Sequence, residues 1–204
     1  ASALGGRTFV LTTTLRALQA VGFALREALA EGGGALDVLV QGELPKRELV
    51  KRFLARPASV LVGSASFWEG IDVPGDALQC VLIDKLPFPP PNDPLVEARV
   101  AQLESQGRSP FNEYFLAEAA VSLKQGAGRL IRSERDRGLL VVCDPRLVLK
   151  GYGARLRKAL PPMTRLKEEG EALAWLRALA AEREAGAAVD DEIQDAPDAA
   201  AAGG

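Results

Sequence analysis

Histidine is absent from this chain of 204 residues, and cysteine and aromatic residues are scarce. The chain therefore lacks the commonest general base and metal ligand among the side chains. Its two cysteines, Cys80 and Cys143, both lie in apolar runs, so we predict two buried thiols and no disulfide. An iron–sulfur cluster usually needs four thiolates and cannot form on this chain alone. We accordingly predict that the chain itself holds no metal.

Long apolar runs and a strong excess of either charge are also missing. No run approaches the ~20 residues of a membrane-spanning helix, and the first residues lack the charged-then-apolar pattern of a signal peptide. These absences predict a cytoplasmic protein without membrane contact. The net charge of −2 means that any groove for nucleic acid must be a local patch.

Two nucleotide-binding motifs are absent as well. The chain has no G-x-x-x-x-G-K-[ST] loop, the Walker A cradle for phosphates, and no D-E-x-x box to hold Mg²⁺. A nucleotide that contacted this chain would therefore have to be held mainly by something else.

Short β-rich apolar runs alternate along the chain with helical patterns. This alternation predicts an α/β fold with a mainly parallel sheet covered by helices on both faces. We predict strands at Thr8–Thr12, Leu36–Gln41, Ser59–Val62, Cys80–Asp84 and Leu139–Cys143. We predict helices at Leu15–Leu29, Pro45–Ala55, Asn92–Gln106, Ser109–Arg132, Leu147–Leu160 and Lys167–Glu184.

The C-terminal residues differ in composition from the rest of the chain. Residues 185–204 are rich in Ala, Gly and Asp and lack bulky apolar side chains, which predicts a disordered tail. The globular domain is therefore predicted to occupy residues 1–184.

The segment 125–132, Q-G-A-G-R-L-I-R, closes the helix predicted at Ser109–Arg132. If that helix continues, Gln125, Arg129 and Arg132 recur at i, i+4 and i+7 on one face, with no carboxylate to neutralise them. Two guanidiniums suit a terminal phosphate on which charge develops. A solvated basic helix face explains the same residues equally well.

A second polar segment, 63–75, begins at the end of the strand predicted at Ser59–Val62. Ligands bind where parallel strands end, and small residues such as Ser64 and Ser66 let a phosphate approach. Asp72 can accept a hydrogen bond from a ribose hydroxyl. The alternative is an ordinary turn after Asp72, with the preceding aromatic residues Phe67 and Trp68 in the core.

Together the two segments resemble motifs V and VI of the superfamily 2 helicases, and most of all those of the DinG/XPD-like group. The motif V resemblance lies in S-F-W-E-G-I-D-V-P-G at 66–75, and motif VI in 125–132. Between them, K-L-P-F-P-P-P-N-D-P at 85–94 resembles the link found in bacterial DinG and YoaA. V-L-T-T-T-L-R-A-L at 10–18 resembles motif IV.

This resemblance implies a RecA-like second helicase domain without its own Walker A loop. In this family ATP lies between two such domains, so ATP and Mg²⁺ are expected to be held mainly by a first, N-terminal RecA-like domain outside this chain. Many members carry an iron–sulfur insert in that other part. The implied partners are single-stranded DNA, the first domain and proteins of replication or repair, and the implied direction of movement is 5′ to 3′.

The resemblance also assigns roles to residues. Arg129 and Arg132 match the motif VI arginines that reach the γ-phosphate of ATP, with Arg132 as the arginine finger. Gln125 is expected to orient the phosphate or the attacking water. In this chain alone, both arginines are expected to be exposed and without function.

Motif V residues are expected to link the nucleotide to the DNA strand. Glu69, Gly70 and Asp72 are the predicted ATP-binding residues of this segment, and Glu69 is a candidate ion-pair partner for a motif VI arginine. Trp68 either packs under the site or stacks on a base. The residues predicted to contact single-stranded DNA are Thr13, Thr14, Ser64, Ser66 and Trp68.

Two other functions fit the same sequence. One is a catalytically inert nucleic-acid-binding or regulatory module that keeps the fold without motor activity. The other is the motor-like part of a DinG-type nuclease. The sequence of the first domain, and whether it carries a Walker A lysine, would separate these from an ATP-dependent DNA helicase.

Overall fold

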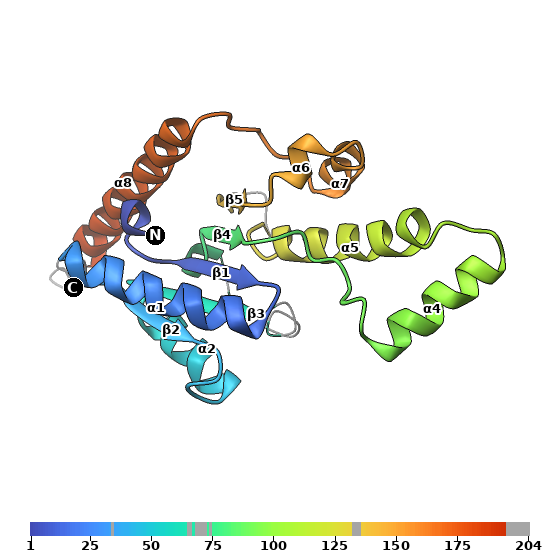
Figure 1. Cartoon of the computed structure of the whole chain (residues 1–204). Helices are drawn as coiled ribbons and strands as arrows, with labels where there is room; N and C mark the ends of the chain where they lie inside the picture. Colours follow the sequence, from blue (N-terminus) through green and yellow to red (C-terminus); the bar gives the residue numbers. More distant parts are fainter. Residues whose placement is uncertain (34, 65–66, 68–72, 74, 132–135, 195–204) are drawn as a thin grey trace, which may run out of the picture. The chain divides into compact units, whose positions relative to one another are not determined.

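The computed structural model describes residues 1–33, 35–64, 67, 73, 75–131 and 136–194 (Figure 1). The chain divides into two compact units, Ala1–Arg165 and Leu166–Gly204. The first contains the sheet, and the second contains helix α8 (Glu169–Gln194). Of the helices in the described part, none combines the length and the apolar character needed to cross a membrane.

A sheet of five parallel strands forms the centre of the first unit. The strand order is β2-β3-β1-β4-β5, so the first strand of the sequence is also the middle strand of the sheet. Each strand lies within one or two residues of its predicted bounds. The strands are β1 (Thr8–Thr12), β2 (Asp37–Val40), β3 (Ser59–Ser64), β4 (Cys80–Ile83) and β5 (Leu139–Val142).

Strand side chains alternate between two apolar cores, one on each face of the sheet. Phe9 of β1 lies in register with Leu61 of β3, and both belong to the larger core. The next pair along, Val10 and Val62, belongs to the smaller core on the opposite face. Strands covered on both faces need apolar side chains in both directions, which explains their continuous apolar runs.

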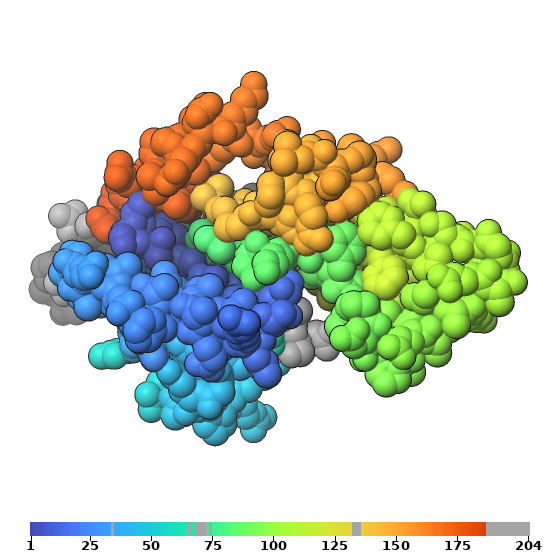
Figure 2. Space-filling view, in the orientation of Figure 1, coloured from blue at the N-terminus to red at the C-terminus, as the bar shows by residue number. Residues whose placement is uncertain are grey.

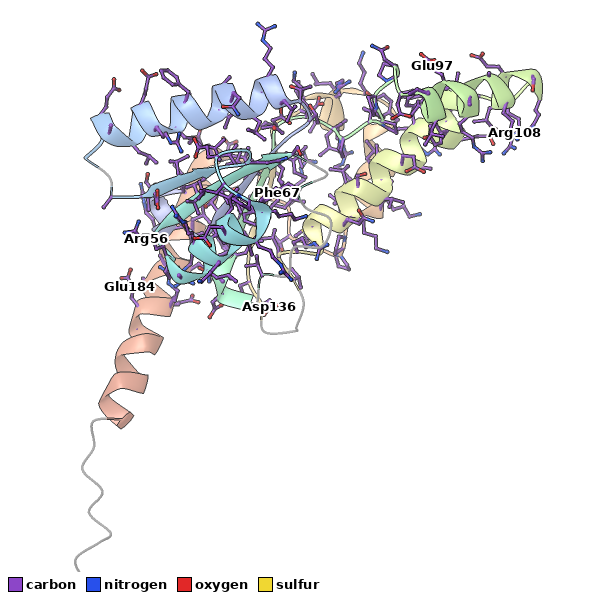
Figure 3. All side chains as sticks on the ribbon, turned by 90° about the horizontal axis from the view of Figure 1, so that it is seen from below. Arg56, Phe67, Glu97, Arg108, Asp136 and Glu184 are labelled. Carbon is purple, nitrogen blue, oxygen red and sulfur yellow. The ribbon has the colours of Figure 1, made fainter. Side chains whose placement is uncertain are left out.

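Helices cover both faces, as predicted. Helix α1 (Leu15–Glu31) places Leu18 in the smaller core. Helices α2 (Lys46–Ala55) and α5 (Leu116–Ala127) contribute to the larger core on the other face. Figure 3 shows the sheet between α1 and α2. The predicted α/β class is therefore confirmed.

Polar side chains begin two of these helices. The hydroxyl of Thr14 accepts a hydrogen bond from the backbone N–H of Ala17 at 3.1 Å and caps α1. Asp93 caps helix α4 (Pro94–Ser105), accepting from Leu95 N at 2.8 Å. Both are ordinary N-caps, in which a side-chain oxygen satisfies a backbone donor of the first turn.

The helix predicted at Ser109–Arg132 differs from the structure at both ends. It begins with a π-helical turn, η3 (Phe111–Phe115), in which Leu116 N donates to the carbonyl of Phe111. At the other end α5 stops at Ala127. Glycine is a poor helix former, and Gly128 stands at the C-cap, so the extension to Arg132 is wrong.

The helix predicted at Leu147–Leu160 is broken in two. Helix α6 covers Arg146–Leu149 and α7 covers Gly153–Ala159, with extended backbone at Lys150 between them. A side chain at position 153 would place its Cβ 2.1 Å from the carbonyl oxygen of Leu147, so the chain can turn this tightly only at glycine.

Helix α8 continues past its predicted end at Glu184 to Gln194. The first part of the tail predicted to be disordered, 185–194, is therefore helical, in keeping with the strong helix propensity of its alanines. Residues 195–204 lie outside the described part, and the domain division at residue 184 stays a prediction.

A buried glycine shows how closely α1 approaches the sheet. Gly22 of α1 is buried, and a Cβ there would lie 2.7 Å from Cγ2 of Val40, a stiff β-branched side chain of β2. The overpacking cost of about 1–3 kcal/mol exceeds or matches the helix-propensity gain of about 1 kcal/mol. Gly22→Ala is therefore expected to lower the free energy of unfolding by up to about 2 kcal/mol, measured by urea denaturation.

Gly186→Ala is the matched control for this substitution. Gly186 also lies in a helix, α8, but a Cβ there has nothing within 4 Å. The control should leave stability unchanged or raise it by up to about 1 kcal/mol. Equal stability of the two variants would show that α1 can move away from β2 at no cost.

Candidate functional site

Polar residues collect where the parallel strands end. Thr13 follows β1, Ser64 ends β3 and Asp84 follows β4. Thr12 and Ser64 are partners in the register between β1 and β3, and the three strands are neighbours in the sheet. Because parallel strands end at one edge, these residues lie along the same edge, where α/β proteins bind ligands.

The end of β1 is held to the end of β4. The backbone N–H of Thr13 donates to Oδ1 of Asp84 at 3.2 Å, and Asp84 N donates to the carbonyl of Leu11 at 2.9 Å. The side chains of Thr13 and Thr14 are both exposed at this edge. The structure thus places two of the predicted DNA contacts side by side and accessible.

The end of β3 is held to the end of β2. Ser64 N donates to Oε1 of Gln41 at 2.7 Å, and Gln41 N donates to the carbonyl of Val62 at 2.9 Å. Ser64 is half-buried. Gln41, just after β2, was not singled out from the sequence, although a polar side chain after a buried strand is a usable signal.

Two residues of the segment after β3 are buried in the larger core. Phe67 is 5% exposed and Val73 is 2% exposed. The Nζ atom of Lys46 lies 5.3 Å from the centroid of the Phe67 ring. The alternative interpretation of Phe67 as a core residue is therefore confirmed. The remaining predicted residues of this segment, Ser66, Trp68, Glu69, Gly70 and Asp72, lie outside the described residues, and their roles stay predictions.

The predicted single face of Gln125, Arg129 and Arg132 is wrong, because the helix ends before it reaches the arginines. Gln125 is exposed in the last turn of α5. After Ala127 the backbone tightens: Arg129 N donates to Gly126 O at 3.2 Å, and Leu130 N to Ala127 O at 3.0 Å. Such i→i−3 bonds are typical of a helix terminus.

Arg129 lies in this turn and is half-buried, not exposed as predicted. Its neighbours in the turn explain why: Ala127 is fully buried, and Leu130 is 1% exposed. The turn is thus anchored in the core on both sides of Arg129. Arg132 lies outside the described residues.

An ion pair at the end of β5 was missed from the sequence. Asp144 is 5% exposed, and its two carboxylate oxygens accept from Leu86 N and Arg146 N, both at 2.9 Å. The Arg146 guanidinium contacts both oxygens, with Nη2 at 2.6 Å from Oδ2. These bonds, led by that of the guanidinium, lower the pKa of Asp144 to about 2.

The Asp144–Arg146 pair joins the ends of β4 and β5, since Leu86 belongs to the segment that leaves β4. An Asp two residues before an Arg, directly after an apolar strand, was the available signal. Among the residues that the structure describes, no three His, Cys, Asp or Glu side chains are grouped so that they could hold a metal ion.

The prediction that both cysteines are buried holds for Cys80 only. Cys143 is exposed, because it follows the last residue of β5 at the carboxyl edge of the sheet. Partial burial raises the pKa of the Cys143 thiol, and the negative charge of Asp84 raises it further. Both effects keep this thiol protonated at neutral pH, which makes it a poor nucleophile.

Residues 1–163 match the model of a protein family described as the helicase C-terminal domain. The chain belongs to this family. The matched residues include the whole described edge of the sheet, from Thr13 to Asp144, and the turn that carries Arg129. Helix α8 lies beyond the match.

Curated relatives agree with this family. The ATP-dependent DNA helicase YoaA of Haemophilus influenzae is 43% identical over 172 residues, covering 84% of this chain and 26% of its own length. The ATP-dependent helicase DinG of Mycobacterium tuberculosis is 41% identical over 179 residues, covering 88% and 26%. The 3′-5′ exonuclease DinG of Bacillus subtilis is 36% identical over 157 residues, covering 76% and 17%.

The chain therefore spans about a quarter of the length of the two helicase relatives. The resemblance to the DinG/YoaA group, first drawn from four short segments, extends over most of this chain and is confirmed. The roles given above to single residues of the family motifs are not tested by these matches and remain predictions.

Proposed function

We propose that this chain is the second motor domain of an ATP-dependent DNA helicase of the DinG/YoaA type. The observation that carries the proposal is the likeness to YoaA, 43% identical over 84% of this chain. The edge of the sheet adds physical support, because Thr13 and Ser64 lie there, at the ends of the neighbouring strands β1 and β3. In such a protein, ATP and Mg²⁺ would be held mainly by a first RecA-like domain outside this chain, and any iron–sulfur cluster would also belong to that other part.

The nucleotide half of the proposal rests on the turn after α5. The buried residues Ala127 and Leu130 hold the backbone on both sides of Arg129, so its side chain leaves a fixed point of the chain. A preorganised cation stabilises developing negative charge without rearrangement at the moment of reaction. Arg129 and Arg132 would supply this charge to the γ-phosphate, and Gln125 would orient the phosphate or the attacking water.

Motif V would connect that nucleotide to DNA. We assign Glu69, Gly70 and Asp72 to the nucleotide side of the site. We assign Thr13, Thr14, Ser64, Ser66 and Trp68 to single-stranded DNA, where hydroxyl and N–H groups bind phosphates without reading bases. Because Ser64 and Asp72 belong to one short segment, closure around ATP would shift both contacts together. Alternate closing and opening would then move the domain along the strand, in the 5′ to 3′ direction implied by the resemblance.

The proposal predicts that this chain alone does not hydrolyse ATP. Half of the catalytic site would be missing, because the chain has no Walker A loop. Phosphate release should stay at background for the purified chain of 204 residues, with or without single-stranded DNA. The complete helicase, assayed beside it, should release phosphate and be stimulated by DNA. Substantial turnover by the purified chain would contradict the division of the site between two domains.

The relative named 3′-5′ exonuclease DinG favours one alternative, in which the motor-like domain accompanies a nuclease. A nuclease assay on the complete protein separates the two functions. Degradation of a 3′-labelled strand without ATP would support the nuclease, whereas ATP-dependent strand separation with intact products would support the helicase. Proteins of replication or repair are further proposed partners.

A further inference from the structure

A basic segment follows the Asp144–Arg146 pair. Residues 145–167 contain no Asp or Glu, although the chain as a whole has a net charge of −2. The same segment contains seven cations, Arg146, Lys150, Arg155, Arg157, Lys158, Arg165 and Lys167. Helices α6 and α7 lie within it. Such a local excess of one charge is what a nucleic-acid contact requires in a protein that is slightly acidic overall.

Most of this positive charge is not neutralised. Arg146 pairs with Asp144, but in the described part of the chain Lys150, Arg155, Arg157 and Lys158 form no salt bridge. Arg155 donates to Oδ1 of Asn112 at 3.2 Å. Arg157 donates to the carbonyl of Leu147. These partners are neutral, so the cationic charge remains.

Three aromatic rings lie beside these cations. Ring centroids are 5.2 Å apart for Phe111 and Tyr152, 5.9 Å for Phe88 and Phe111, and 6.0 Å for Phe88 and Tyr152. The rings come from three separate segments, after β4, in η3 and just before α7. Phe111 is 42% exposed, and the other two rings are half-buried. Figure 2 shows that the orange surface of α6 and α7 adjoins the green and yellow-green surfaces of these segments.

The spacing of residues at α7 places one aromatic ring and two cations on the same side of this helix. Tyr152, Arg155 and Lys158 recur every third residue, which places them along one side of α7. Tyr152 contacts the ring of Phe111, and Arg155 bonds to the next residue, Asn112. The nearby carboxylate of Glu113 is paired with Arg108. The exposed ring of Phe111, the half-buried ring of Tyr152 and two cations without a salt bridge in the described part of the chain thus form one surface.

We propose that this surface, the α7 face (Phe111, Tyr152, Arg155 and Lys158), binds single-stranded DNA in addition to the contacts proposed at the strand ends. The choice of DNA as the ligand rests on the proposed function, but the residues are different ones. Arg155 and Lys158 bind the phosphates, and a base stacks on Phe111 or Tyr152. This combination is typical of sequence-independent binding to single strands. An acidic peptide would bind the cations but would have no group to stack on the aromatic rings.

The electrostatic part is tested on the chain of 204 residues with a fluorescein-labelled dT oligonucleotide and anisotropy measured over a series of salt concentrations. Arg155→Gln/Lys158→Gln removes two charges that form no salt bridge with any carboxylate in the described part of the chain. The slope of log K against log salt should become less steep by about 1.4, at roughly 0.7 per phosphate contact on a single strand. Arg155→Lys should keep most of the parent slope.

Lys51→Gln/Arg56→Gln is the matched control. Both residues are exposed, and Arg56, which pairs with Asp37 at 3.1 Å, follows α2 near the opposite, amino-terminal edge of the sheet (Figure 3). The variant loses the same net charge, so a general electrostatic attraction would change its slope equally. We expect its slope to stay within error of the parent value.

The stacking part is tested with an oligonucleotide of the same length that lacks bases. The parent should prefer dT over the abasic strand by roughly fivefold or more, as expected for one stacked base. Tyr152→Leu should lose that preference, while its thermal unfolding shows whether the fold persists. Phe111→Leu, at the more exposed ring, provides the second test if Tyr152→Leu unfolds.

Several results would overturn the proposal. These are an unchanged salt slope in Arg155→Gln/Lys158→Gln, an undiminished base preference in both ring variants, no binding of dT by the parent, or equal competition by poly-glutamate. If binding were lost in Thr13→Val/Ser64→Ala but unchanged in every variant of the α7 face, the α7 face would be overturned and the proposed function would stand. Conversely, a complete helicase without DNA-stimulated ATPase would overturn the proposed function, even if the α7 face binds DNA.

Discussion

Arg132→Ala in the complete helicase is expected to lower kcat for DNA-stimulated ATP hydrolysis by roughly 10³–10⁵, the usual worth of an arginine finger. ATP should still bind, because the phosphate cradle and Mg²⁺ site would belong to the first domain. The loss should therefore appear in kcat with little change in the affinity for ATP. Steady-state phosphate release and binding of a fluorescent ATP analogue measure the two quantities separately.

Arg99→Ala is the control for that experiment. Arg99 is exposed on α4 and bonds to the side chain of Gln102 on the same helix, so its loss should leave kcat unchanged. A wild-type rate for Arg132→Ala would show that the finger is misassigned. Arg129→Ala would then be the next variant to measure, since Arg129 is fixed in the turn after α5.

Asp144→Asn is expected to produce the second large effect, this time on stability. The variant keeps the shape of the side chain but removes the charge that holds Arg146, in a site where the side chain is only 4% exposed. Breaking a buried, hydrogen-bonded ion pair costs about 3–5 kcal/mol. Because Arg146 is 42% exposed and can regain water, we expect a loss of about 2–3 kcal/mol in the free energy of unfolding at pH 7.

The ionised carboxylate of Asp144 also predicts how the free energy of unfolding changes in acid. Its pKa is about 2 in the folded chain against an ordinary value of 3.8, and a group with a lowered folded pKa stabilises the fold when it is ionised. That stabilisation, about 2 kcal/mol, is fully present above about pH 4 and is lost as the pH falls through about 2. Asp144→Asn should lack this pH-dependent part of the stability.

Urea denaturation of the parent and the variant between pH 5 and pH 2 measures the difference. Asp76→Asn serves as the control, because the Asp76 side chain is exposed. The parent and the control should lose stability in parallel, while Asp144→Asn should lose less over this interval. Parallel curves for all three proteins would show that Asp144 does not hold the fold together through its charge.

The central fold was predictable because the strands are covered on both faces. Strand β1 is buried at every position, and its central residues Phe9, Val10 and Leu11 form an apolar run that is visible without any structure. The flanking helices were equally visible, since their start signals are local, as with Thr14 and Asp93. Pairing order was not predicted, because nothing local says that β4 joins β1 on its far side.

Helix ends were predicted less well, and this affected the candidate site. A run of residues that fits a helical stripe does not show where the helix stops, and the stripe through Gln125, Arg129 and Arg132 crosses Gly128. The observed turn buries Leu130 and leaves Arg129 half-buried. Similarly, Gly153 decides the break between α6 and α7 through a contact with Leu147, which only the fold brings about.

Contacts between strand ends could not be predicted either. The bonds from Thr13 to Asp84, from Ser64 to Gln41 and from Leu86 to Asp144 each join residues that are far apart in sequence. The individual residues Thr13 and Ser64 were identified through family motifs, but their partners belong to no short pattern. The exposure of Cys143 has the same origin, because a strand's last apolar residue and the first residue beyond it look alike in sequence.

The π-helical turn at Phe111–Phe115 makes segment length as important as composition. Its hydrogen bond, from Leu116 N to Phe111 O, spans one residue more than that of an α-helix. Deleting one residue there would rotate everything before it by about 100° around the helix axis. Phe111 would swing away from Tyr152, and Asn112 would leave Arg155, while α5 kept its place on the sheet. The extra residue in the turn therefore sets the rotation between η3 and α5, so that the two helical segments face different partners.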